Sequence, residues 1–151
     1  MERLFLFGRK LNPYCMTSLD SVMEESSETL IREAKLNLQA GDVPAARAPL
    51  HTILEQYPDH REGLYYLAVC ERQAGESTVA IELLDRLISK HPRYGRAYQE
   101  YGHNLAANKD AEGATEAFEK AVKLNPALMA SWQALLGRYR FLGSADKAED
   151  A

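Results

Sequence analysis

The sequence predicts an all-α protein, an α-solenoid in which antiparallel helix hairpins stack in a row. Two observations predict this fold class. Pro58, Pro92 and Pro126 are each separated by 34 residues. Alanines recur at the same interval, and a fixed period of about 20–50 residues is typical of stacked repeats. The alanines in question are Ala46, Ala80, Ala114 and Ala148.

The unit over residues 95–128 shows how each repeat forms two helices. Tyr98, Tyr101, Gly102 and Leu105 follow the i, i+3, i+4, i+7 spacing of one helix face. After a break, a second apolar stripe indicates the partner helix, which ends at Asn125-Pro126 because proline disfavours helical backbone in the preceding residue. That stripe consists of Ala114, Ala117, Phe118, Ala121 and Val122.

The turns inside the hairpins share one chemistry. Gly41, Gly75 and Gly143 occupy the same place in the repeat, and Lys109 fills it in the third unit. Glycine at this place suits a left-handed helix C-cap. The following residue is acidic or Ser, which favours the start of the next helix. These residues are Asp42, Glu76, Asp110 and Ser144.

Small and large residues also alternate in register, which indicates close helix packing. Small residues in the first helices face larger ones in the second helices, so that two helix axes approach closely. The small residues are Ala34, Ala68 and Gly102, and the larger ones are Leu50, Leu84 and Phe118.

The period divides the chain into an irregular leader over 1–16 and a helical extension over 17–26, with one helix running from about residue 18 to 40. Three units follow at 27–60, 61–94 and 95–128, and residues 129–151 form a partial fourth unit or a capping helix. Proline and polar residues in the first unit, including Pro49, Glu33 and Asn37, predict that it packs least well.

Composition narrows the possible functions. A net charge of −4 argues against a nucleic-acid-binding surface, and no apolar stretch is long enough to span a membrane. The two cysteines, Cys15 and Cys70, are too few for a disulfide framework, so we expect free thiols and a cytoplasmic protein.

The sequence also lacks the patterns of metal sites and catalytic sites. The four histidines do not have metal-ligand spacing: His51, His60, His91 and His103. With no phosphate loop, zinc motif or nucleophile elbow, we expect no cofactor and no catalysis.

These residues give the chain a resemblance to tetratricopeptide repeat proteins, whose unit reads W-x2-L-G-x2-Y, then A-x3-F, then P. The third unit matches as Tyr98, Tyr101-Gly102, Leu105, Ala114, Phe118 and Pro126, and the fourth offers Trp132, Leu135 and Tyr139. The resemblance covers residues 27–151 and implies a right-handed superhelix of about three and a half units.

The resemblance further implies a protein-interaction scaffold, whose first helices line a concave groove for a peptide or a partner helix. Family members that clamp a chaperone's C-terminal carboxylate carry Lys, Asn and Arg at the places where this chain has Ile31, Tyr66 and Glu100. We therefore expect no chaperone clamp. The groove positions carried onto this sequence are Ile31, Lys35, Leu38, Tyr65, Val69, Arg72, Arg96, Gln99 and His103.

The fourth unit leaves alternatives open. It stops at Ala151 as either a terminal cap or part of a longer protein, and the register of Gly143 and Ala148 favours the latter. A rival function is therefore a repeat segment of a multidomain enzyme, such as a repeat-bearing sulfotransferase, that docks substrate or subunits. An RNA-binding hairpin array is disfavoured by the acidic balance.

The incomplete repeat also predicts self-association, because it should expose the apolar residues Trp132, Leu135 and Leu142.

Overall fold

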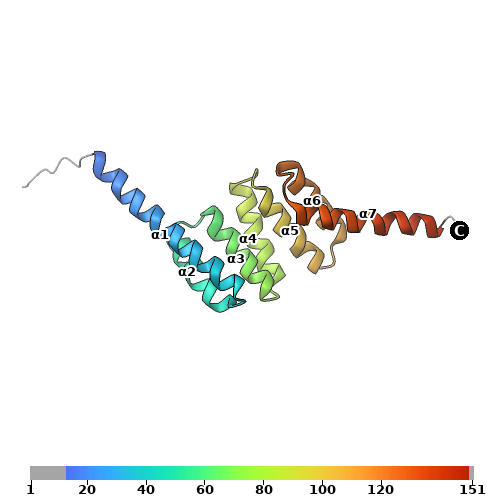
Figure 1. Ribbon diagram of the computed structural model, residues 1–151, viewed down its shortest axis with the longest axis horizontal. Coiled ribbons are helices and arrows are strands. Elements are labelled where there is room, and N and C mark those ends of the chain that lie inside the picture. Colours follow the sequence, from blue (N-terminus) through green and yellow to red (C-terminus); the bar gives the residue numbers. More distant parts are fainter. Residues whose placement is uncertain (1–12, 150–151) are drawn as a thin grey trace, which may run out of the picture.

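The computed structural model describes the backbone of residues 13–149 and the side chains of residues 26–143. This part of the chain folds into seven helices and contains no strand (Figure 1), which confirms the all-α solenoid. The helices are α1 (Pro13–Gln39), α2 (Val43–Gln56), α3 (Arg61–Gln73), α4 (Ser77–Lys90), α5 (Gly95–Ala107), α6 (Ala111–Leu124) and α7 (Met129–Glu149).

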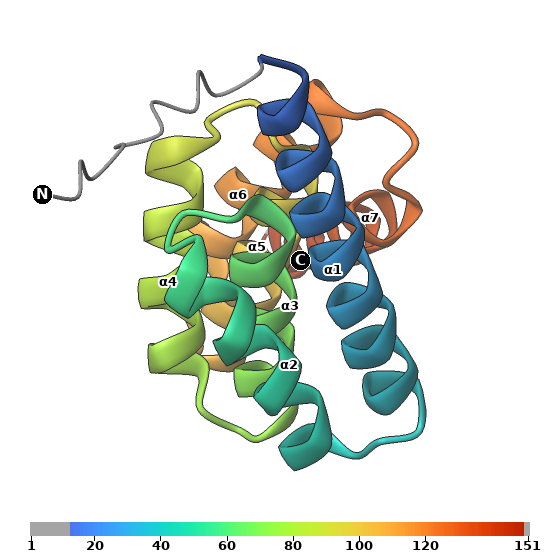
Figure 2. The ribbon, with the colours of Figure 1, turned by 90° about the vertical axis from the view of Figure 1, so that its left-hand side faces the viewer.

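Consecutive helices pair as hairpins, and the hairpins follow one another in a row. The first helices of neighbouring pairs also touch, since α1 contacts α3 and α3 contacts α5. Seen along the row (Figure 2), α1 and α4 lie on opposite sides of α3. The last helix, α7, packs against α6, and its far end extends beyond the other helices.

The hairpin turns have the predicted backbone. Gly41 and Gly75 adopt φ values of 77° and 84°, and Lys109 adopts 65° at the equivalent place. Asp42 and Asp110 then cap α2 and α6 by accepting hydrogen bonds from the backbone N–H groups of Ala45 and Gly113. The first and third turns therefore satisfy helix-end backbone groups that have no partner within the helix. Glu76, at the same place in the second turn, makes no side-chain capping bond.

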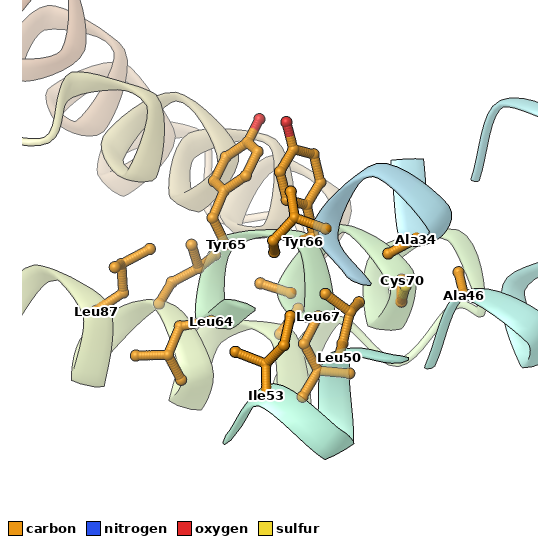
Figure 3. Close-up of a cluster of buried hydrophobic side chains, with 14 of the residues drawn as sticks. Ala34, Ala46, Leu50, Ile53, Leu64, Tyr65, Tyr66, Leu67, Cys70 and Leu87 are labelled. Carbon is orange, nitrogen blue, oxygen red and sulfur yellow. The ribbon is translucent and has the colours of Figure 1, made fainter. Parts of the chain in front are cut away.

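The core lies between the helices of each hairpin and between neighbouring hairpins (Figure 3). Ala34, Ala46 and Ala68 are fully buried, as are the larger residues Leu50 and Leu84. In the third pair, Gly102 lies so close to Phe118 that a Cβ atom would stand 2.7 Å from its ring. The exchange of small and large residues predicted from the repeat is thus present in the packing.

Two predictions on the helix bounds are wrong. Residues 1–16 were expected to form an irregular leader, but α1 begins at Pro13, because proline is well suited to the first turn of a helix. Residues 1–12 lie outside the described part. Gly143 was expected to end a helix, but α7 continues through it to Glu149.

Two polar residues at places where the repeat has apolar ones, Asn37 and Glu71, have hydrogen-bond partners. Asn37 donates a hydrogen bond from Nδ2 to the carbonyl of Ala45, while Glu71 accepts two from the Arg47 guanidinium. Glu33 is exposed to solvent. Among residues 13–149, no helix is long and apolar enough to cross a membrane.

Candidate partner-binding groove

The nine predicted groove residues all lie on α1, α3 and α5, the first helices of the three pairs. The chain brings these helices side by side, so the residues come from one layer of the solenoid. Ile31 and Tyr65 are buried, at 3% and 5% exposure, and belong to the core. The other seven are half-buried. These seven have surface that a partner could contact.

Three of the half-buried residues are held by neighbouring side chains. Arg72 forms an ion pair with Glu100, a carboxylate only 3% exposed. Gln99 accepts a hydrogen bond from the Ser131 hydroxyl at 3.1 Å and so ties α5 to α7. His103 lies edge-to-face against Phe118 with ring centroids 5.0 Å apart, and burial lowers its pKa. These contacts position the first helices.

Lys35 and Arg96 belong to a different arrangement, in which cations lie over tyrosine rings. The Lys35 ammonium stands 5.0 Å from the Tyr66 ring centroid, and the Arg96 guanidinium 4.7 Å from that of Tyr65. The two rings meet edge-to-face at 5.0 Å. Figure 3 shows both hydroxyls pointing to the same side, away from Leu50 and Ile53.

The arrangement continues to a third cation. Tyr65 meets Tyr94 edge-to-face at 5.8 Å, and the Arg61 guanidinium stands 5.1 Å from the Tyr94 ring centroid. Cations over aromatic faces are attracted by the ring quadrupole, so the rings hold these side chains in place. The six residues form what we call the cation–tyrosine array: Lys35, Tyr66, Tyr65, Arg96, Tyr94 and Arg61.

The array presents hydrogen-bond donors at neutral pH. Burial raises the pKa of Tyr65 to about 12, although the nearby Arg96 opposes the shift. Burial also raises the pKa of Tyr94. Both hydroxyls therefore stay protonated, and the Arg96 guanidinium lies 3.5 Å from the Tyr65 oxygen. The surface combines cationic and neutral donors.

Two open clefts meet at Arg61. A cleft of about 820 Å³ is bordered by Ile31 and Arg61, and by Tyr57, His60 and His91 from the interhelical turns. A smaller one of about 320 Å³ lies between Arg61, His91 and Tyr94. The array thus borders hollowed surface at the N-terminal end of α3, where a partner's side chains would find room.

Comparisons with known proteins agree with this architecture. Residues 31–95 and 72–128 match the sequence profile described as Tetratricopeptide repeat. The chain belongs to the tetratricopeptide repeat family. Over an aligned region of 99 residues, 66% of the chain, the sequence is 30% identical to anaphase-promoting complex subunit 3 of Schizosaccharomyces pombe. The chain spans only 15% of that relative's length.

Solved structures share the repeat fold. The first tetratricopeptide domain of Spaghetti (RPAP3), bound to an HSP90 peptide, superposes with a TM-score of 0.71 at 16% identity, covering 79% of this chain and 94% of that one. An O-GlcNAc transferase mutant of Thermobaculum terrenum gives 0.71 at 23% identity over 74% of this chain and 22% of that one. At these identities the likeness concerns the fold.

Reasoning from tetratricopeptide repeat positions missed half of the array. Three residues of the array were not among the nine predicted groove residues, namely Arg61, Tyr66 and Tyr94. The adjacent pair Tyr65-Tyr66 and the spacing Tyr94-x-Arg96 are the only signals in the sequence. Neither spacing says which ring each cation covers, because that depends on contacts between α1, α3 and α5.

The described residues contain neither a metal-binding cluster nor a reactive thiol that could serve the groove. Within the described residues, no cluster of three His, Cys, Asp or Glu side chains could hold a metal ion. Cys70 is free and buried, and burial raises the pKa of its thiol to about 11, so the reactive thiolate is scarce at neutral pH. The side chain of Cys15 lies outside the described residues.

Proposed function

We propose that this chain is a protein-interaction scaffold that binds a peptide or partner helix on the surface formed by α1, α3 and α5. The observation that carries the proposal is the cation–tyrosine array, which joins all three first helices through contiguous ring contacts. Tyr and Arg are the residue types that most often dominate binding energy at protein interfaces.

The fold and the relatives support this role. A tetratricopeptide domain of similar fold is bound to an HSP90 peptide. For this chain we keep the peptide-binding role and set aside the chaperone clamp, because Glu100 is already paired with Arg72 and Tyr66 fills another clamp position.

The proposal is tested by site-specific photo-cross-linking. A photoreactive phenylalanine placed at Lys35 or at Arg96 should cross-link the same proteins from a lysate of the source cells. The same group at Lys120, an exposed residue of the second helix α6, is the matched control. Equal capture by all three positions would place the binding surface elsewhere. Tyr65 is left intact because, as a core residue, its loss would leave a cavity.

A second candidate is a repeat segment within a larger enzyme, docking substrate or subunits for a separate catalytic domain. The similarity to the O-GlcNAc transferase, over 22% of that chain, favours it. Mass spectrometry of the endogenous protein tests it, because a mass near 16.9 kDa would contradict it. A larger protein whose substrate turnover falls when Lys35 and Arg96 are replaced would support it.

A further inference from the structure

We propose that the partner segment is acidic and that its Asp and Glu side chains bind across Lys35, Arg61 and Arg96. The inference rests on the proposed function and names the chemistry of the partner. The occupant is an internal stretch of a partner protein, recognised through side-chain carboxylates.

The three cations lack acidic partners. In the described part of the chain, the ion pairs involve Arg47, Arg72, Arg86 and Lys90. Lys35, Arg61 and Arg96 are absent from them. Glu28, Asp59 and Glu62 border the cleft beside Arg61. Asp59 is paired with Arg86 and Lys90, and neither glutamate forms an ion pair among the described residues. Three unpaired cations therefore face two unpaired carboxylates, which leaves a local excess of positive charge in a protein with a net charge of −4.

The helix ends add to that positive charge. Arg61 is the first residue of α3 and Arg96 the second residue of α5. Helix N-termini carry a partial positive charge, so cations there are unfavourable in the free protein and favourable once an anion binds. The N-terminus of α5 contributes more of this charge, because its first turn has no acidic residue and its N-cap, Tyr94, makes no side-chain capping bond. The first turn of α3 contains Glu62.

Ring contacts keep these cations available to a ligand. Each ring occupies one side of its cation and supplies no full negative charge. A carboxylate can therefore still form charge-assisted hydrogen bonds with each head group.

The opposite end of the surface has a different character. Arg72 is paired with Glu100, and two other predicted groove residues, Leu38 and Val69, are apolar and half-buried against the core. An extended partner would thus place its acidic residues over the array and apolar residues towards Leu38 and Val69. Charge complementarity therefore favours an acidic segment over a neutral or basic one.

The test selects peptides without assuming a sequence. A random dodecapeptide library, displayed so that no peptide has a free C-terminus, is selected on the full chain. We expect the bound peptides to be enriched in Asp and Glu. An enriched peptide, made with an amidated C-terminus, should bind about tenfold more weakly to Lys35→Glu and to Arg61→Glu. Its affinity should also fall as salt rises from about 50 to 300 mM.

Lys120→Glu is the matched control, since Lys120 also lies over a tyrosine ring, 4.7 Å from Tyr98, but on α6. It should leave the affinity unchanged, and thermal melting monitored by circular dichroism verifies that each variant folds. Neutral or basic peptides that lose affinity in a Lys35→Ala variant would overturn the acidic partner while preserving the groove. Peptides insensitive to every array substitution, or no bound peptide at all, would overturn both proposals.

Discussion

The three hairpin turns each place one residue in left-handed backbone, and only in the third unit does this residue have a side chain. Gly41 and Gly75 adopt left-handed backbone at no steric cost, whereas Lys109 adopts φ = 65° at the same point of the third unit. A residue with a Cβ atom is disfavoured there by roughly 1–2 kcal/mol. The third turn is therefore formed against a local penalty.

Lys109→Gly should relieve this strain and raise the free energy of unfolding by about 1 kcal/mol. Urea denaturation followed by circular dichroism measures the change. Asn108→Gly is the matched control, because Asn108 has φ = −83° and no strain to relieve. A gain in both variants, or in neither, would contradict the strain assignment.

His60 caps helix α3, a role that the sequence did not predict. Its Nδ1 accepts a hydrogen bond from the Gly63 N–H at 3.0 Å and so caps α3. Burial lowers the pKa of His60 below 6.5. The folded state thus favours the neutral ring, and this stability is fully present above pH 6.5 and lost as the pH falls through the folded pKa.

His60→Asn should weaken that pH dependence, because asparagine can cap the helix without titrating. Between about pH 7.5 and 5, we expect the wild type to lose about 1 kcal/mol more stability than the variant. His103, also with a lowered pKa, is present in both proteins and cancels in the comparison. Parallel pH profiles in urea denaturation would show that His60 is not the titrating cap.

The contact between helices α5 and α6 depends on Gly102 and Phe118 as a pair, since the ring occupies the space that a larger residue at position 102 would need. Gly102 leaves room for Phe118, while the first two pairs combine Ala34 with Leu50 and Ala68 with Leu84. The two combinations fill similar space in different ways, which explains why the repeat tolerates both.

Gly102→Ala should destabilise the protein by roughly 1–3 kcal/mol, because the new methyl group overpacks against the buried ring. Adding Phe118→Leu should restore most of the loss by reproducing the combination of the first two pairs. Gly137→Ala is the control, since no atom lies within 4 Å of the added Cβ. A double variant as unstable as the sum of the single ones would refute the coupling.

The repeat predicts helix pairs well and side-chain partners poorly. Proline and glycine spacing anticipated the hairpins because those residues act on the local backbone. The ring covered by Arg61 or Lys35 depends on contacts between helices far apart in sequence, which spacing does not encode. The continuation of α7 through Gly143 was missed because glycine permits a helix end without requiring one.

The last helix, α7, has an exposed apolar face in the described part of the chain. Its Trp132, Leu136 and Tyr139 are 42%, 54% and 48% exposed. The expected exposure of Leu135 is wrong, because its side chain packs with Phe118 and is only 3% exposed. The three exposed residues lie one repeat after Tyr98, Gly102 and Leu105, and Gly102 is covered by Phe118 of α6. The face is thus apolar and in register with one that another helix covers.

We therefore expect this chain to self-associate through α7. Sedimentation equilibrium should show the average mass rising with protein concentration, and Leu136→Glu should reduce this rise by placing charge on the apolar face. Val79→Glu alters an exposed apolar residue of α4 and should leave association unchanged. A strict monomer at high concentration would refute association through α7.

We propose that the first helices bind the partner through the cation–tyrosine array. The most direct test of this proposal is amide chemical-shift mapping by nuclear magnetic resonance during titration with a selected acidic peptide. We predict that the largest shifts fall around Lys35, Arg61 to Tyr66, and Tyr94 to Arg96. Shifts concentrated on α2, α4 and α6, with those residues unmoved, would show that the partner does not bind at the array.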